Sequence, residues 1–282
     1  MTTEDLLTGD DQRARWNGHA GRTWVARQES LDRLFQPVED DLLAHVVASS
    51  PGAVLDIGCG TGATTLGAAR ALGSAAHCVG LDISEPMIAH ARRRAEAAML
   101  GVEFIAGDAA THPFEPASFD FVMSRFGVMF FPDPVNAFRH IRAATRAGAE
   151  LHFYCWRSPA ENAFMTAADR AAGPLLPPAP TKPTNAPGQF AFADSRYVQR
   201  ILEQSGWSDV EISRADYEMT LPVGELEDYY LRMGAVGSLL PSLDADIRSR
   251  IVDAMRPEFE KFVCGDQVKF NAACWHVAAV AD

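Results

Sequence analysis

The chain has 282 residues, 48% of them hydrophobic, and its 25 Lys and Arg against 37 Asp and Glu give a formal net charge of −12. This length fits one α/β domain with an insertion or a small cap. The acidic balance, with no local stripe of Lys and Arg, argues against nucleic acid as a partner, because such partners are bound largely through neutralised phosphates.

The N-terminal sequence and the spacing of the cysteines and histidines lead us to expect a cytoplasmic protein. The first residues are acidic where a secretory signal is basic, and no run of about 18 residues is apolar throughout, so we expect no membrane partner. The five cysteines form no C-x-x-C pair, and the eight histidines show no H-E-x-x-H or H-x-E spacing. The sequence therefore predicts no metal site.

The chain begins with a polar stretch, residues 1–12, which we expect to be frayed. Residues 13–48 then carry apolar positions at helical spacing, broken at Pro37, and predict two or three helices before any sheet. The segment Trp16–Trp24 is rich in aromatic residues. This segment either forms a helix that two buried tryptophans fix to the domain, or contacts a ligand directly.

A strand, a tight turn and a helix are predicted next, and they organise the domain. The stretch Val54-Leu55-Asp56-Ile57-Gly58-Cys59-Gly60-Thr61-Gly62 ends an apolar run in three alternating glycines, and residues 63–72 follow as a helix. Glycines allow left-handed backbone angles and let a ligand lie against the turn, where the free N–H groups of the helix start face it. This is a cofactor-binding turn.

Asp56 helps to decide which cofactor the turn binds. The glycines alone also satisfy the dinucleotide fingerprint. A carboxylate two residues before Gly58 would repel a pyrophosphate by several kcal/mol at an effective dielectric constant of about 20. S-adenosylmethionine instead offers a cationic sulfonium and an ammonium group, so Asp56 favours that cofactor.

Three further strands complete the cofactor side. Residues 77–82 end in Asp82, 24 residues after Gly58, where an acid can accept from a ribose diol. Residues 102–106 lead into Gly107-Asp108-Ala109. Residues 118–124 form the fourth strand, whose apolar exit at 125–133 borders the ligand crevice of an open parallel sheet.

The rest of the chain alternates helix and strand around two insertions. We expect a helix at 134–147, a strand at 149–156, a helix at 195–206 and strands at 210–215 and 267–281. The prolines of residues 174–187 favour an extended lid or connector. The second insertion, about 222–265, carries apolar residues spaced for one helical face, among them Tyr229, Tyr230, Met233, Leu239 and Leu240.

The glycine-rich nonapeptide resembles the first motif of the class I S-adenosylmethionine-dependent methyltransferases. The exit Phe126-Gly127 is similar to the S-F-G segment of their ubiquinone and menaquinone C-methylases, and N-P-P-Y, typical of amine and amide methylation, is absent. Arg125 stands where that family has serine and Met129-Phe130 where it has a polar pair, which argues against a quinone ring as acceptor.

The resemblance implies an α/β, three-layer Rossmann-like methyltransferase fold, with a mostly parallel seven-stranded sheet, one antiparallel edge strand and helical lid insertions. The implied divisions are an N-terminal helical flap at 1–48, an S-adenosylmethionine-binding core at 49–157, a lid insertion at 158–192, and a C-terminal part of the core at 193–282 with its helical insertion at about 222–265.

The resemblance also assigns roles in the site. It implies that Asp56 lies near the methionine end of the cofactor and that Asp108 and Ala109 meet the adenine. Together with the ribose ligand Asp82, the expected cofactor-binding residues are Trp24, Asp56, Gly58, Gly60, Gly62, Asp82, Ile83, Met87, Asp108, Ala109, Arg125 and Phe126.

The implied reaction is in-line transfer of a methyl group to O, C or N of a small molecule. It needs mainly alignment and exclusion of water, and a base only if the acceptor arrives protonated. The candidate catalytic residues are His19 and Tyr154, with His152 and Glu161 as further base candidates.

The expected acceptor is mostly apolar and aromatic, because eight apolar side chains could converge over the crevice: Phe126, Met129, Phe130, Phe131, Phe164, Met165, Phe190 and Phe192. Two alternatives remain open, an NAD(P)-dependent oxidoreductase on the same turn and a non-catalytic cofactor-binding scaffold. The oligomeric state is open as well, with a homodimer among the options.

Overall fold

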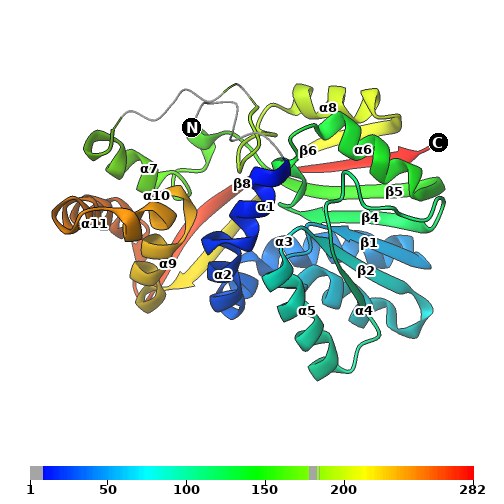
Figure 1. Ribbon diagram of the computed structural model, residues 1–282, viewed down its shortest axis with the longest axis horizontal. Helices are drawn as coiled ribbons and strands as arrows, with labels where there is room; N and C mark the ends of the chain where they lie inside the picture. The colour runs from blue at the N-terminus through cyan, green and yellow to red at the C-terminus, as the bar shows by residue number, and fades with distance from the viewer. Residues whose placement is uncertain (1–8, 178–182, 184) are drawn as a thin grey trace.

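The computed structural model describes residues 9–177, 183 and 185–282, and its centre is one twisted sheet of order β3-β2-β1-β4-β5-β8-β6 (Figure 1). All pairings are parallel except those of β8, which runs antiparallel to both β5 and β6. The strands are β1 (Ala53–Ile57), β2 (His77–Asp82), β3 (Glu103–Ala106), β4 (Phe119–Arg125), β5 (Thr145–Trp156), β6 (Trp207–Pro222), the short β7 (Val263–Cys264) and β8 (Gln267–Ala281).

Helices on both faces of the sheet give three layers, which confirms the expected Rossmann-like methyltransferase architecture (Figure 1). One face carries α3 (Gln28–Ser49), α4 (Ala63–Leu72) and α5 (Glu85–Ala98), and the other carries α6 (Pro134–Ala143) and α8 (Ser195–Gln204). Because both faces are covered, every residue of β1 is buried and the strand reads as an unbroken apolar run around Asp56. The expected antiparallel pair lies at the sheet edge, with β8 inside and β6 outermost.

Capping residues set the starts of the two helices on the second face. Asp133 accepts a hydrogen bond from the Asn136 backbone N–H (3.0 Å) at the start of α6, where Pro134 takes the first helical position. Asp194 accepts from the Arg196 N–H (3.0 Å) at the start of α8. The side chains of Asp133 and Asp194 therefore satisfy backbone donors that these helix starts would leave free.

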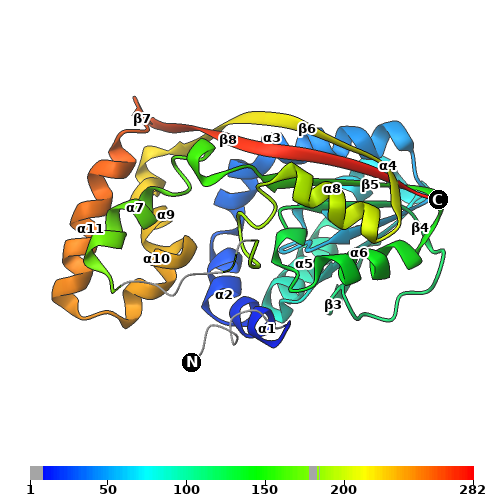
Figure 2. The same ribbon diagram turned by 90° about the horizontal axis from the view of Figure 1, so that it is seen from above.

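A second group of helices lies beyond the end of the core sheet (Figures 1 and 2). Strands β6 and β8, 16 and 15 residues long, extend past the other strands to reach it. Between the two groups lie the first helices, α1 (Gly9–Asn17) and α2 (His19–Ala26). The second group consists of α7 (Ala167–Ala172), α9 (Leu226–Arg232), α10 (Gly234–Leu239) and α11 (Ala245–Glu260).

Several element boundaries differ from the sequence expectations. The helix expected to reach residue 147 ends at Ala143, because Thr145 already pairs with Phe119 across an irregular start of β5. The strand expected at 210–215 runs from Trp207 to Pro222, since β8 pairs with it along nearly its whole length. Residues 9–12 belong to α1 and are not frayed, and residues 1–8 lie outside the described residues.

The two insertions also differ in detail from the expectations. Tyr229 and Tyr230 of the second insertion lie on α9 and Leu239 lies on α10, with Met233 between the helices and Leu240 in the short 3-10 helix that follows. These positions therefore do not share one helix, and α10 begins at Gly234, where φ is +74°. Of the proline-rich stretch 174–187, residues 178–182 and 184 lie outside the described residues. Among the helices of the described chain, none has the length and apolar character needed to cross a membrane.

Candidate cofactor and substrate site

The glycine turn after β1 is held tightly to its neighbours. Gly58 has φ +68° and its N–H donates to the Leu81 carbonyl oxygen (2.8 Å). A Cβ on Gly58 would lie 2.7 Å from the Cα of Gly127 at the exit of β4, so the two backbones touch. Gly60, with φ +56°, donates its N–H to Asp82 Oδ2 (2.8 Å). The turn therefore needs glycine both for its angles and for its close contacts.

Asp82 lies at the end of β2 and faces the turn. Its second oxygen, Oδ1, accepts from the Ser84 N–H (2.8 Å), so two backbone donors orient the carboxyl. Burial raises the pKa of Asp82 to about 6. Each carboxylate oxygen has a further lone pair, so the group can still accept from two hydroxyls of a ligand.

Asp56 lies beneath the turn and not on the wall of the site. Its Oδ2 accepts hydrogen bonds from Thr64 Oγ1 (2.5 Å) and Thr65 Oγ1 (2.6 Å), the first residues of α4. Its Oδ1 is buried and accepts no hydrogen bond from any described residue. Burial raises the pKa of this carboxyl to about 6. Asp56 therefore joins β1 to the start of α4 and does not line the cavity described below, and its expected contact with the methionine end of the cofactor stays a prediction.

Gly62 likewise faces away from the site. It has φ +86°, and a Cβ there would lie 2.7 Å from Cζ of Phe104 and 3.0 Å from Cβ of Ala91. The third glycine is required for α4 to pack against β3 and α5. Gly62 does not line the cavity, and its expected contact with the cofactor stays a prediction.

A single cavity of about 560 Å³ lies in front of the turn. This volume is in the range of sites for cofactors and drug-sized ligands, which is roughly 300–1,000 Å³. Ten of the twelve expected cofactor-binding residues line it: Trp24, Gly58, Gly60, Asp82, Ile83, Met87, Asp108, Ala109, Arg125 and Phe126.

The N-terminal segment contributes to the wall of the cavity, as the ligand-contact alternative for Trp16–Trp24 requires. Both Trp16 and Trp24 line the cavity. Trp24 stacks on Phe35 (ring centroids 6.1 Å apart), and Trp16 meets Phe130 edge-on (5.1 Å). Both tryptophans are partly exposed and line the cavity, so direct contact of this segment with a ligand stays a prediction.

Arg125 lies on the wall but its charge is already paired. Its Nη1 lies 2.8 Å from Oε2 of Glu39, and both side chains are almost fully buried. Its guanidinium also lies over the Phe35 ring, 5.7 Å from the centroid. Arg125 therefore ties β4 to α3 and leaves the cavity a mainly apolar wall at this point.

Many of the side chains that line the cavity are apolar, as the sequence predicted, although Asp169, Arg232 and Ser238 also line it. Seven of the eight expected side chains line it, and the exception is Phe192, which packs against Phe138 and Phe153 (6.3 Å each). The structure adds residues that the sequence had not placed there: Gln12, Arg15, Tyr229, Tyr230, Met233 and Phe259. Gln12 is notable because its Oε1 is buried without a hydrogen-bond partner among the described residues.

The candidate catalytic residues do not reach this cavity within the described chain. His19 is exposed and contacts Thr23 Oγ1 (3.3 Å). Tyr154 is fully buried in β5, where its hydroxyl donates to Asp41 (2.8 Å) and burial raises its pKa. Glu161 accepts from Arg157, whose hydrogen bonds lower the carboxyl pKa to about 2. These contacts lie away from the cavity wall, so the geometry does not favour the expected catalytic roles of His19 and Tyr154.

His152, the fourth base candidate, belongs to a cluster that sequence patterns had missed. It lies beside His45 and His276, and one ring nitrogen from each is within 4.8 Å of the others. These residues are 107 and 124 positions apart along the chain, so no local spacing could reveal them. The expectation that no metal site exists rested on local spacing alone.

Comparison with known proteins agrees with this geometry. Residues 54–148 match the sequence model of a methyltransferase domain. A demethylmenaquinone methyltransferase of Mycolicibacterium gilvum is 31% identical over 165 residues, which is 56% of this chain and 68% of that protein. The chain belongs to the class I S-adenosylmethionine-dependent methyltransferases, of the menaquinone C-methylase type.

Membership of this family makes S-adenosylmethionine its cofactor. Aklanonic acid methyltransferase DauC of Streptomyces sp. (strain C5) is 39% identical over 101 residues, 36% of this chain and 46% of DauC. The match thus spans less than half of that relative. A crystal structure of a putative methyltransferase from Bacillus halodurans C-125 superposes with a TM-score of 0.54 at 20% identity, covering 85% of this chain and 98% of that one, which supports the fold.

Proposed function

We propose that this methyltransferase-family chain transfers a methyl group from S-adenosylmethionine to a small, mostly apolar, aromatic acceptor. The observation that carries the proposal is the continuity of the cavity. Its wall runs from Gly58, Gly60 and Asp82 at the strand ends to Phe164 and Met165 on the far side. A cofactor on the turn and an acceptor among these apolar side chains would share one enclosure.

The residues on the wall fit the parts of this cofactor. Asp82 is oriented by two backbone donors and would accept from the ribose hydroxyls. Asp108 would accept from the adenine amino group, and its carboxyl is oriented by the Ala110 N–H, which donates to Oδ1 (2.9 Å). Gly58 and Gly60 of the turn line the cavity and would lie against the methionine portion. When bound, S-adenosylmethionine supplies a methyl group on a cationic sulfur, an electrophile that needs no further activation.

The protein's own contribution is alignment and exclusion of water. Trp16, Trp24, Phe126 and Phe130 contribute aromatic side chains to the wall of the cavity. These apolar surfaces would exclude water beside the reacting atoms, and holding two reactants in line is worth about 7–11 kcal/mol of barrier in favourable cases. With His19 and Tyr154 away from the cavity, we infer an acceptor that reacts without a base from these side chains.

The names of relatives support a small-molecule acceptor. They concern aklanonic acid, nocamycin and demethylmenaquinone. The net charge of −12 agrees with a small molecule rather than nucleic acid as the acceptor. We also propose that the reaction takes place in the cytoplasm. The atom that receives the methyl group is O, C or N.

The proposal is tested in two steps. Titration calorimetry with S-adenosylhomocysteine and, separately, NADH should give binding of the first alone; binding of NADH alone would favour an oxidoreductase instead. A panel of apolar phenols and hydroxylated polycyclic aromatics, with sugar-like and highly charged acceptors as the comparison set, is then incubated with methyl-labelled cofactor. Label transfer to aromatic acceptors supports the proposal. Transfer confined to the charged set contradicts the acceptor class, and tight cofactor binding without transfer to any acceptor favours the scaffold alternative.

A further inference from the structure

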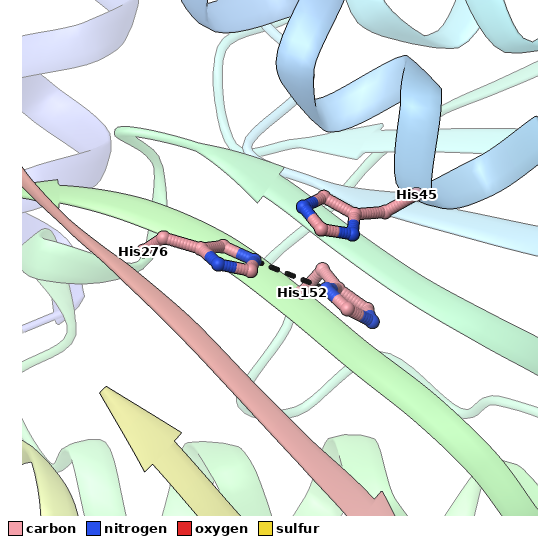
Figure 3. A group of neighbouring side chains, drawn as sticks. All are labelled: His45, His152 and His276. Carbon is pink, nitrogen blue, oxygen red and sulfur yellow. Dashed lines mark hydrogen bonds between the residues drawn. The ribbon is translucent and has the colours of Figure 1, made fainter. Parts of the chain in front are cut away.

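Three histidines from distant parts of the chain meet outside the cofactor cavity (Figure 3). His45 comes from α3, His152 from β5 and His276 from β8. One ring nitrogen of each lies within 4.8 Å of the other two. His152 is buried, whereas His45 and His276 are partly exposed, so the cluster is open to small solutes. None of the three lines the cavity described above.

Two of the rings already face one another through their nitrogens. His152 Nδ1 and His276 Nε2 are 3.1 Å apart, and the two ring planes differ by only 18°. Two imidazole nitrogens bound to one tetrahedral Zn²⁺ at about 2.0–2.1 Å lie roughly 3.3 Å from each other. The spacing of this pair is therefore close to that of two ligands on one ion.

The surroundings of His152 resemble the support that metal-binding histidines receive. Its other ring nitrogen, Nε2, lies 3.1 Å from Glu150 Oε2, and Ser49 Oγ donates to the other oxygen of the same carboxylate (2.9 Å). A carboxylate that accepts from one ring N–H leaves the lone pair on the opposite nitrogen, which here is Nδ1. That nitrogen is the one that faces His276.

A second carboxylate lies near the cluster. Asp41 on α3 interacts electrostatically with His45 and His276, and the hydroxyls of Tyr154 and Tyr217 donate to it. With Glu150, the cluster therefore has two carboxylates nearby to offset the charge of a cation. Neither would need to enter its first coordination sphere.

We propose that His45, His152 and His276 form a binding site for a divalent cation of the Zn²⁺ type. Imidazole is a preferred ligand of Zn²⁺, Co²⁺ and Ni²⁺, and a site of three histidines leaves one position for water. The ring of His45 lies nearly parallel to the other two, at 23° and 15°, with centroids 4.6 and 4.4 Å away. The ring of His45 therefore stacks on the other two rings. It must turn about its Cβ–Cγ bond to direct a nitrogen toward the ion.

Such an ion would join α3 to β5 and β8. The helix α3 also carries Phe35, which lines the cofactor cavity, and Glu39, which pairs with Arg125. Binding would therefore stabilise the fold near the cofactor site without contacting cofactor or acceptor. This inference does not depend on methyl transfer.

The test uses the full chain without an affinity tag, freed of metals with a chelator. Titration with ZnCl₂ should give one ion per chain and a melting temperature several degrees higher, because an ion that binds only the folded state stabilises it. Titration with Co²⁺ should give the intense visible absorption of four-coordinate cobalt. Two or more weak sites, or the faint spectrum of hydrated Co²⁺, would overturn the proposal.

Matched variants locate the site. His276→Phe and His45→Phe keep a flat ring to stack in the cluster and should each abolish the Zn²⁺ shift and the cobalt band. His77→Gln removes an exposed histidine of β2, and Cys264→Ser removes an exposed thiol. Both variants should keep the Zn²⁺ shift and the cobalt band of the parent protein. If His276→Phe melts early without metal, His45→Gln, at a partly exposed helical position, decides the matter. Retained one-to-one binding in the folded His45 variants would refute the assignment.

Discussion

Gly58 and Gly127 touch backbone to backbone: a Cβ on Gly127 would lie 2.8 Å from the Cα of Gly58 and 2.6 Å from the Ile57 carbonyl oxygen. This contact joins the exits of β1 and β4, the two strands that border the cofactor turn. It explains why glycine stands after Phe126, which itself has φ +63°.

Gly127→Ala should therefore push the two strand exits apart. Overpacking of this kind costs about 1–3 kcal/mol, and the displaced turn should bind S-adenosylhomocysteine at least tenfold more weakly by calorimetry. Gly101→Ala is the matched control, because a Cβ at Gly101 meets open space. Equal affinity of Gly127→Ala and the parent protein would show that the contact does not shape the turn.

Asp82→Ala should weaken cofactor binding while the fold survives. The loss of a charge-assisted contact of about 1.5–3 kcal/mol corresponds to a roughly ten- to hundredfold higher dissociation constant. Asp194→Ala is the control: like Asp82, Asp194 accepts from the N–H two residues on, but it lies outside the cavity wall. It should cost about 1 kcal/mol of stability as a helix cap and leave the affinity unchanged. An unaltered dissociation constant in Asp82→Ala would remove this residue from the site.

Asp56→Asn should change how stability depends on pH. Burial raises the pKa of Asp56 to about 6 in the folded protein, against about 3.9 in an unfolded chain. The folded state therefore binds the proton more tightly, so this group stabilises the fold below about pH 4 and the contribution is lost as the pH rises to about 6. Two pKa units correspond to about 3 kcal/mol.

The measurement is urea denaturation of both proteins between pH 4 and pH 7. The parent should lose up to about 3 kcal/mol of unfolding free energy relative to Asp56→Asn over this interval. The contribution of Asp82 is present in both proteins and cancels. Parallel stability curves would mean that Asp56 stays ionised across the range.

Met165→Ala should act on the acceptor and not on the cofactor. Met165 lines the far half of the cavity, where the Tyr229 hydroxyl donates to its sulfur (3.7 Å). Once an acceptor is known, the shortened side chain should raise KM for it about tenfold, as lost apolar contacts in a pocket do, while S-adenosylhomocysteine affinity stays the same. Met99→Ala serves as the control, because Met99 is 91% exposed. A parallel loss of both affinities would place Met165 in the cofactor half.

The cofactor half could be predicted from sequence because its residues are local. Gly58, Gly60 and Asp82 lie at the ends of strands that are recognisable in the sequence as apolar runs. Parallel strands bring their carboxyl ends to one edge of the sheet. Asp56 shows the limit of such reasoning. Its position in the motif was correct, but a residue inside a strand faces one side or the other of the sheet, and here Thr64 and Thr65 bind its carboxyl on the side of α4.

The remaining features depend on contacts between distant segments. Tyr229 and Phe259 reach the cavity only because β6 and β8 carry α9 and α11 to its far side. Tyr154 appeared suited to catalysis, yet the sheet buries it against Asp41 of α3. These contacts cannot be inferred from spacing along the chain, because each arises where one element packs on another.

Pro222 and Gln267 are paired neighbours in the ladder of β6 and β8, so the 44 residues between them, among them β7, which pairs with β8, begin and end at one point of the sheet. Segments whose ends already meet can be exchanged with little disturbance to the rest of a domain. The helices α9, α10 and α11, which supply Tyr229, Tyr230 and Phe259 to the cavity wall, thus form one exchangeable segment. Replacing that segment would change the part of the wall that it supplies, while Phe164, Met165 and the glycine turn stay in place.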